Sequence, residues 1–164
     1  MRLFLALWPD DALRVRLAAA QQAWQWPARA ARVPPDRLHL TLHFLGEVPE
    51  PEAHELAASL PPCTAPFTLR LDLPSLWPQG IAVLEPGEPP AGLAALHREL
   101  GALLRAKGLR VEARAFRPHV TLARYAQGAT VPAGLPAIDW AVRGYALVRS
   151  HPGTPPRYAP VARA

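Results

Sequence analysis

The chain has one cysteine, Cys63, and one lysine, Lys107, among its 164 residues. A single cysteine cannot form an internal disulfide, so we expect the protein in a reducing compartment, the cytoplasm. The lone lysine lies outside any nucleotidyl-lysine motif and the sequence has no glycine-rich phosphate loop, which excludes an ATP-dependent ligase. No apolar run approaches the roughly 18 residues that a membrane span needs, and the short apolar start lacks a signal-peptide cleavage site. We therefore expect no membrane partner.

Arginine and proline, by contrast, are abundant. The formal net charge is +5, and nearly all of the positive charge is arginine, whose planar fork binds phosphate bidentately. This balance favours a polyanionic partner, although a GC-rich genome also produces a composition rich in Arg, Ala, Leu and Pro. Many of the 21 prolines fall in short connectors, where they separate structural elements. Charge thus supports a nucleic-acid partner without establishing one.

Hydrophobic periodicity predicts helices and strands in one domain spanning residues 1–164. The helices are expected at 9–24, 51–60 and 91–107. The strands are expected at 2–7, 38–45, 67–73, 80–84, 109–113, 118–125, 140–149 and 157–161, with 80–84 beside 67–73. Because runs of strands lie between helices in no regular alternation, an α+β fold is favoured over a doubly wound sheet.

Two short segments carry the same arrangement of histidine and threonine. They are Leu38-His39-Leu40-Thr41-Leu42 and Pro118-His119-Val120-Thr121-Leu122. In a strand, residues i and i+2 lie on one face, so each histidine shares a face with its threonine while the apolar residues face the other way. One His-x-Thr arises easily by chance, whereas two copies on matching strands indicate a paired site. They also suggest two lobes of related plan.

Two imidazoles facing each other across a cleft suit an in-line displacement at phosphorus. One takes a proton from the nucleophile while the other protonates the leaving oxygen, and histidine serves in either form near neutral pH. The hydroxyls of Thr41 and Thr121 are suited to donate to the non-bridging oxygens, where charge develops. His39 and His119 are therefore the predicted catalytic pair.

Other functions fit parts of this pattern. His39, His43 and His119 form a conceivable three-histidine site of a metallohydrolase, but no acidic residue accompanies them and the threonines are then unexplained. A non-catalytic RNA-binding module, in which the histidines merely line a basic groove, predicts salt-sensitive binding without chemistry. For either motif alone, a buried histidine bound to the backbone is the structural alternative.

Several further residues are candidates for the site. His43 follows Thr41 by two residues and is expected on the same face, as an accessory group near the mouth of the cleft. Phe44 is expected on the opposite face, in the core. Arg117, two residues before His119 in the densest basic stretch, is a second accessory candidate. The aromatic residues suited to stack on bases, among which the sequence does not choose, are Phe4, Trp8 and Tyr158.

Both motif segments resemble the signature motifs of the RNA 2′,3′-cyclic phosphodiesterases. They read Leu-His-Leu-Thr-Leu-His-Phe-Leu-Gly-Glu at 38–47 and Phe-Arg-Pro-His-Val-Thr-Leu-Ala-Arg at 116–124. This family, also called 2′-5′ RNA ligases, belongs to the two-histidine phosphoesterase superfamily. The opening stretch 2–7 and the closing stretch 150–158 resemble its first and last strands.

The resemblance implies an α+β fold of two pseudo-symmetric lobes, with antiparallel sheets lining a central cleft and helices on the outside. It implies hydrolysis of RNA 2′,3′-cyclic phosphate ends, such as those of tRNA fragments, to 2′-phosphomonoesters without a metal or another cofactor, and we expect a monomer. Any 2′-5′ ligation would be the ATP-independent reverse reaction. By carry-over, His39 is the general acid for the leaving 3′ oxygen, His119 is the general base for water, and Thr41, Thr121 and Arg124 hold the phosphate.

Overall fold

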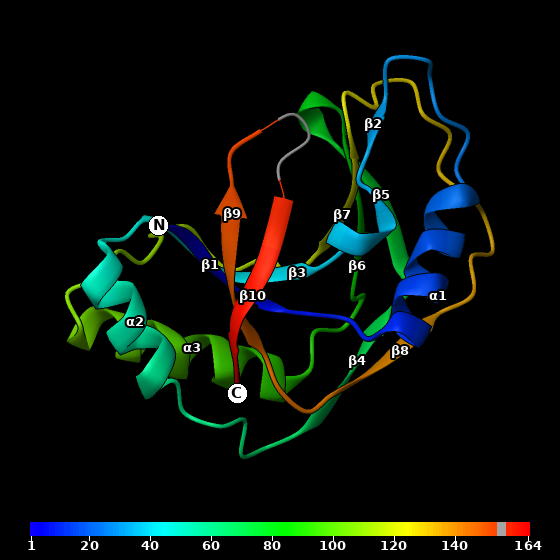
Figure 1. The fold of residues 1–164 in the computed structure, drawn as a ribbon. Coiled ribbons are helices and arrows are strands. Elements are labelled where there is room, and N and C mark those ends of the chain that lie inside the picture. Colours follow the sequence, from blue (N-terminus) through cyan, green and yellow to red (C-terminus); the bar gives the residue numbers. More distant parts are fainter. Residues whose placement is uncertain (154–156) are drawn as a thin grey trace.

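The computed structural model describes residues 1–153 and 157–164, so part of the closing stretch 150–158 lies outside the described residues. Its helices are α1 (Asp11–Gln22), α2 (Glu50–Ser59) and α3 (Ala91–Ala106), with the short 3-10 turns η1 (Pro35–Arg37) and η2 (Pro78–Gly80). All three helices lie where hydrophobic periodicity predicts them (Figure 1). In α1, Asp10 caps the first turn by accepting a hydrogen bond from the Leu13 amide at 2.8 Å.

The strands form antiparallel pairs. They are β1 (Arg2–Leu7), β2 (Ala31–Arg32), β3 (Leu40–Glu47), β4 (Phe67–Leu71), β5 (Leu73–Trp77), β6 (Ile81–Glu85), β7 (Val120–Arg124), β8 (Ile138–Val142), β9 (Ala146–His151) and β10 (Arg157–Arg163). The main sheet has the order β10-β9-β1-β3-β7-β6-β5, with β2 added beside β7, while β4 and β8 pair separately. The predicted α+β class with antiparallel sheets is confirmed.

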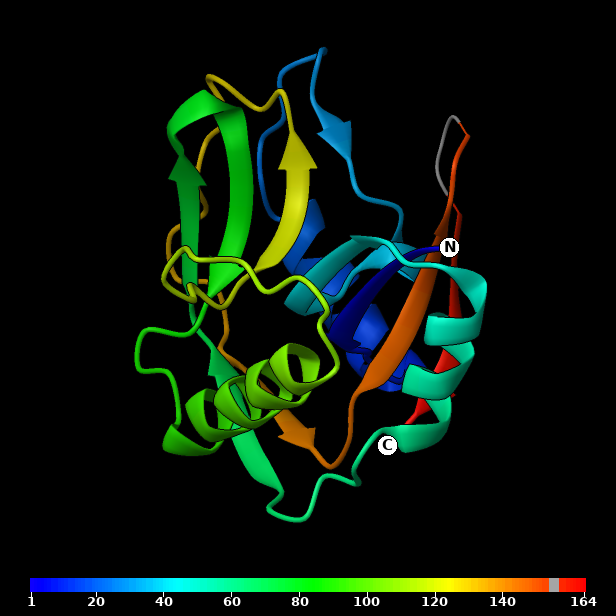
Figure 2. The same ribbon diagram turned by 90° about the vertical axis from the view of Figure 1, so that its left-hand side faces the viewer.

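The main sheet consists of two groups of strands that meet at one point. β3 and β7 are in register at a single residue pair of the described chain, Leu40 opposite Val120. Figure 2 shows β5, β6 and β7 in green and yellow on one side of this junction, and β1, β9 and β10 in blue, orange and red on the other. Because the two His-x-Thr motifs flank this junction, each group of strands brings one motif to the same region.

Several predicted strand limits are wrong, and two of them are wrong because strand pairing depends on distant partners. The run 67–73 is split at Asp72, where the chain leaves β4, paired with β8, and enters β5, paired with β6. The segment 80–84 therefore neighbours β5 rather than β4. The run 140–149 is likewise two strands, β8 and β9, separated at 143–145. Residues 109–113 alternate like a strand but are not one, because Leu109 closes the end of α3 through a bond from its amide to the Leu104 carbonyl.

The apolar alternation of β1 places its two faces in different surroundings. Leu3, Leu5 and Leu7 are fully buried in the main core, beneath the helices. Phe4 and Ala6 point to the other face, where they form a smaller cluster with Ala146 and Val148 of β9; Trp8, Phe44 and Tyr158 pack against it. The face of the sheet away from the helices is thus partly aromatic.

A buried glutamine joins α1 to the second motif strand. Gln21 is 5 % exposed, and its Nε2 donates to the carbonyls of Val33 and Leu122, both at 2.8 Å. The Leu122 carbonyl also accepts from the Val33 amide at 2.8 Å. The helix, the segment that follows β2 and the strand β7 are therefore held together by one side chain.

Replacing Gln21 by leucine should lower the stability of the protein. The change preserves apolar packing but removes the donor to the carbonyls of Val33 and Leu122, of which that of Leu122 keeps the Val33 amide. A buried polar group that loses its partner costs about 1–3 kcal/mol. We expect a loss of that size in the free energy of unfolding, measured by urea denaturation. The matched control is Gln22→Leu at the exposed neighbouring position, which should stay within about 0.5 kcal/mol of the wild type. Equal effects of the two changes would contradict this role of Gln21.

Candidate active site

A β-bulge follows the threonine of the first motif and changes which side chains face the site. Thr41 pairs with Ala6 and His43 pairs with Leu5, so that Leu42 is an extra residue without a partner in β1. An inserted residue reverses the alternation of faces beyond it. Phe44 therefore lies on the face of His39 and Thr41 and lines the pocket described below, whereas His43 points away and is 4 % exposed.

The second motif has a bulge at the matching position. Thr121 pairs with Val83 and Ala123 pairs with Ala82, leaving Leu122 as the extra residue. Arg124, five residues after His119, consequently lines the pocket as Phe44 does five residues after His39. The two halves repeat the bulge as well as the motif, and they place an aromatic ring in one half and a guanidinium in the other.

Each motif histidine is held through the same ring nitrogen. Nδ1 of His39 lies 2.6 Å from the Arg37 carbonyl oxygen, and Nδ1 of His119 lies 2.7 Å from the Arg117 carbonyl oxygen. A carbonyl only accepts, so in both rings Nδ1 is the donor and carries a hydrogen. Nε2 is then left for chemistry in both residues.

The two motifs line one pocket of about 460 Å³, a volume typical of small-ligand sites. Both histidines and both threonines line it. The remaining lining residues are Arg2, Phe4, Ala31, Arg32, Val33, Pro34, Arg37, Phe44, Arg124, Ser150 and Tyr158. The structure therefore brings together His39, Thr41, His119, Thr121 and Arg124 around one pocket.

The pocket is strongly cationic. Arg2, Arg32, Arg37 and Arg124 line it, and no acidic residue is among its lining side chains in the described chain. Within residues 1–153 and 157–164, none of these four arginines forms an ion pair with a carboxylate. Unpaired guanidinium groups around two threonine hydroxyls suit an anionic ligand, above all a phosphate ester.

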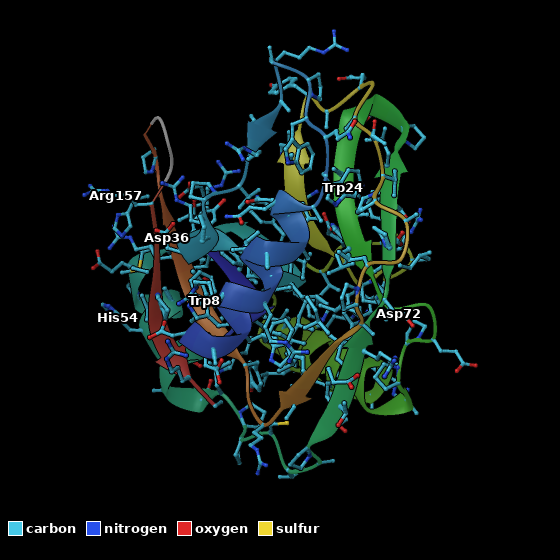
Figure 3. All side chains as sticks on the ribbon, turned by 90° about the vertical axis from the view of Figure 1, so that its right-hand side faces the viewer. Trp8, Trp24, Asp36, His54, Asp72 and Arg157 are labelled. Carbon is cyan, nitrogen blue, oxygen red and sulfur yellow. The ribbon has the colours of Figure 1, made fainter. Side chains whose placement is uncertain are left out.

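His39 lies in an aromatic environment. The rings of Phe4, Tyr158 and Trp8 lie 4.9, 5.5 and 5.6 Å from its imidazole, between ring centres. Trp8 is labelled in Figure 3, which looks onto α1. Burial lowers the pKa of His39 below its ordinary value of 6.5, the bond to the Arg37 carbonyl acts in the opposite direction, and the charge of His119 lowers it further.

Glu85 and Trp77 support His119, Glu85 through its bonds to Arg117 and Trp77 by packing against the His119 ring. Glu85, 6 % exposed, accepts from Nε of Arg117 at 2.7 Å and from Nε1 of Trp77 at 3.1 Å. The Arg117 guanidinium lies 4.2 Å over the Trp77 ring, and that ring lies 4.5 Å from the His119 imidazole. Burial lowers the pKa of His119, whereas the Arg117 carbonyl and the negative charge of Glu85 raise it.

Neither proposed accessory residue lies in the pocket. The expectation that His43 shares the face of His39 is wrong because of the bulge; its ring stacks on His97 at 4.0 Å, and its Nε2 lies 2.8 Å from the His97 carbonyl oxygen. The Arg117 guanidinium is bound to Glu85, and only its backbone carbonyl serves the site. Phe44, expected in the core, lines the pocket instead.

The three-histidine metal site is also wrong in its geometry, since His43 does not join His39 and His119. Across the described part of the chain, no group of three or more His, Cys, Asp or Glu side chains is placed to hold a metal ion.

No helix among the described residues is long and apolar enough to cross a membrane.

Sequence reasoning missed several residues of the site. Arg2, Arg32 and Arg37 line the pocket from segments outside the two motifs, and Glu85 and Trp77 support His119 from neighbouring strands. One available signal was the arginine two residues before each histidine, in Arg37-Leu38-His39 and Arg117-Pro118-His119. The other residues give no local signal, because strand pairing alone brings them to the site.

Comparison with known proteins shows the family. Residues 9–154 match the model of the 2′-5′ RNA ligase superfamily. The chain belongs to this superfamily. A protein of Thermus thermophilus named RNA 2′,3′-cyclic phosphodiesterase is 38% identical over 92% of this chain and 82% of its own length. One of Escherichia coli with the same name is 37% identical over 73% of this chain and 69% of its own length.

Solved structures of the superfamily share the fold. E. coli LigT, in a crystal structure complexed with 3′-AMP, superposes with a TM-score of 0.81 at 30% identity, covering 99% of this chain and 96% of that chain. The assignment to the RNA 2′,3′-cyclic phosphodiesterases, made from the two His-x-Thr motifs, is thereby confirmed at the level of the family.

Glu85→Gln should lower the pKa of His119. The change removes the negative charge that raises this pKa and keeps an amide able to bind Trp77 or Arg117. The pKa is measured by NMR titration of the His119 ring protons, with Glu88→Gln as the control at an exposed position three residues away. An unchanged or higher pKa in the Glu85→Gln variant would show that this carboxylate does not act on His119.

Proposed function

We propose that this protein hydrolyses RNA 2′,3′-cyclic phosphate ends to 2′-phosphomonoesters, with His39 and His119 as the acid and base and without a metal. The observation that carries the proposal is the pairing of two imidazoles, each bound through Nδ1, in one arginine-lined pocket with two threonines. The names of the two relatives and the adenylate in the LigT complex agree with a ribonucleotide substrate.

The Nδ1 bonds support both catalytic roles. When the ring is neutral, its hydrogen is on Nδ1 and the lone pair is on Nε2, which then accepts a proton from water. When the ring is charged, Nε2 carries the second hydrogen and protonates the leaving oxygen. The reaction needs one ring in each form, and each transfer typically contributes about 10²–10⁴ in rate.

The roles follow the family resemblance. Nε2 of His119 takes the proton from the attacking water as the bond from water oxygen to phosphorus forms. Nε2 of His39 gives its proton to the 3′ oxygen as the bond from phosphorus to that oxygen breaks. The hydroxyls of Thr41 and Thr121 and the guanidinium of Arg124 bind the non-bridging oxygens, whose negative charge grows in the transition state.

The same groups support ligation when the 5′-hydroxyl of a second RNA takes the place of water. Nε2 of His119 then takes the proton from that hydroxyl, and Nε2 of His39 protonates the leaving 3′ oxygen. The phosphate stays on the 2′ oxygen, so a 2′-5′ linkage forms from a cyclic phosphate without ATP. The energy for joining comes from the strain of the five-membered ring, and the reverse of this step cleaves the linkage.

Replacing either histidine by asparagine should reduce kcat for a cyclic-phosphate-ended oligoribonucleotide by at least about 10²-fold. Asparagine retains a donor near the Nδ1 position but has no Nε2, so it removes the proton transfer with little change in packing. Turnover is assayed in excess EDTA, with product analysis to distinguish the 2′- from the 3′-monoester. The matched control is His54→Asn, an exposed histidine of α2.

The other results of these assays distinguish the proposed acid–base mechanism from a metallohydrolase and from an RNA-binding module. Near-normal turnover by the His39→Asn or His119→Asn variant would remove that residue from the acid–base pair. Loss of wild-type turnover in EDTA would favour a metallohydrolase, and salt-sensitive RNA binding with no turnover would favour a binding module.

The pH profile should be bell-shaped with its maximum on the acid side of 6.5. Burial lowers the pKa values of both His39 and His119 from the ordinary 6.5. Below both values the base is protonated and above both values the acid has lost its proton, so kcat/KM of the free enzyme falls on either side. We expect kcat/KM for a cyclic nucleotide to decline as the pH rises above 6.5. A maximum well above 6.5 would contradict this assignment.

A further inference from the structure

Two walls of different chemistry line the pocket. One wall, the aromatic wall, comes from β1, β3 and β10 and contains Phe4, Phe44 and Tyr158. The other, the arginine wall, consists of Ala31, Arg32, Val33, Pro34 and Arg37, of which the two arginines carry the charge. Arg2 belongs to the aromatic side, since its guanidinium lies 5.3 Å over the Phe44 ring.

The arginine wall is rigidly attached to the motif strands. β2 pairs with β7, with Ala31 opposite Arg124. The carbonyl of Val33 is held by Gln21, and the Arg37 amide donates to the Pro34 carbonyl at 2.9 Å. The carbonyl of Arg37 also binds Nδ1 of His39. The wall thus lies at a defined position relative to both the phosphate-binding side chains and the catalytic pair.

The positive charge of the pocket exceeds what the reacting group requires. A cyclic phosphodiester carries one negative charge, and Arg124 with two threonines and two imidazoles already addresses it. Arg32 and Arg37 have no carboxylate partner among the described residues, and Asp36, which lies between them in the sequence (labelled in Figure 3), does not line the pocket. Two further guanidinium groups in a confined site are stabilised by a second anion.

We propose that Arg32 and Arg37 bind the phosphate on the 5′ oxygen of the terminal nucleotide, so that the enzyme selects RNA ends over free cyclic nucleosides. This inference rests on the proposed function. In an RNA chain the next negative charge beyond the cyclic group is the phosphodiester on the 5′ side of the same ribose. The base of that nucleotide is the apolar part of the ligand and stacks on the aromatic wall, while the 5′ phosphate meets the arginine wall.

The test compares three substrates that differ only at the 5′ oxygen. They are a nucleoside 2′,3′-cyclic phosphate with a free 5′-hydroxyl, the same nucleotide with a 5′-monophosphate, and a dinucleotide ending in the cyclic phosphate. For the wild type, kcat/KM should be higher by roughly tenfold or more on the two substrates that carry a 5′ phosphate. The monophosphate and the dinucleotide together distinguish a terminal phosphate from an internal phosphodiester as the bound group.

The variants Arg32→Gln and Arg37→Gln should each reduce this preference. The readout is the ratio of kcat/KM for the dinucleotide to kcat/KM for the cyclic nucleoside, which does not depend on the amount of folded enzyme. We expect this ratio to fall roughly tenfold in either variant. Arg98→Gln, at an exposed position of α3 away from the pocket, is the matched control and should keep the wild-type ratio.

The outcomes separate this inference from the function on which it rests. A wild-type ratio near one, or ratios unchanged in both arginine variants, would overturn the 5′-phosphate site while leaving the cyclic phosphodiesterase activity intact. Absence of turnover on all three substrates would instead overturn the proposed function itself. A preference for the 5′-monophosphate but not for the dinucleotide would limit the site to terminal phosphates and overturn selection of RNA chains.

Discussion

The hydrogen bond from Nδ1 of each motif histidine to the carbonyl two residues earlier governs the chemistry of the site. It is made by His39 to Arg37 and by His119 to Arg117, at nearly equal distances. Because a backbone carbonyl has no hydrogen to give, the bond settles which nitrogen carries the hydrogen in the neutral ring. Both rings therefore offer the same atom, Nε2, to a ligand, and either proton-transfer role is open to each.

The β-bulges determine which further side chains join this pair. Without the extra residues Leu42 and Leu122, the faces beyond each threonine would be reversed, and His43 would occupy the position that Phe44 holds. The bulges are supported from the helices. Gln21 of α1 donates to the Leu122 carbonyl, and His97 of α3 forms a hydrogen bond with the backbone of Leu42. Burial and the charge of His43 lower the pKa of His97 to about 4, although the bond to Leu42 acts in the opposite direction. The first helix thus supports the second motif strand and the third helix supports the first.

The two halves repeat the backbone plan but differ in electrostatics. His39 has the aromatic rings of Phe4, Trp8 and Tyr158 around it, whereas His119 has Trp77 beside it and the charge of Glu85 behind. A carboxylate favours the protonated imidazole and an apolar environment disfavours it. The same structural repeat therefore places its two histidines in different electrostatic surroundings, and the pocket has one aromatic and one cationic wall.

The sequence alone located the three helices and the two His-x-Thr motifs, because these depend on local patterns. Helical spacing of leucines located α3, and period-two alternation placed His39 with Thr41 and His119 with Thr121 on one side of each motif segment, just where β3 and β7 begin. What the tertiary structure decided depends on pairing between distant segments. The division of residues 140–149 into β8 and β9 and the reversal of His43 and Phe44 both follow from where partner strands lie. Arg2 and Arg32 come to the pocket for the same reason, since no local period relates a residue of β1 or β2 to the motif residues next to β3 and β7.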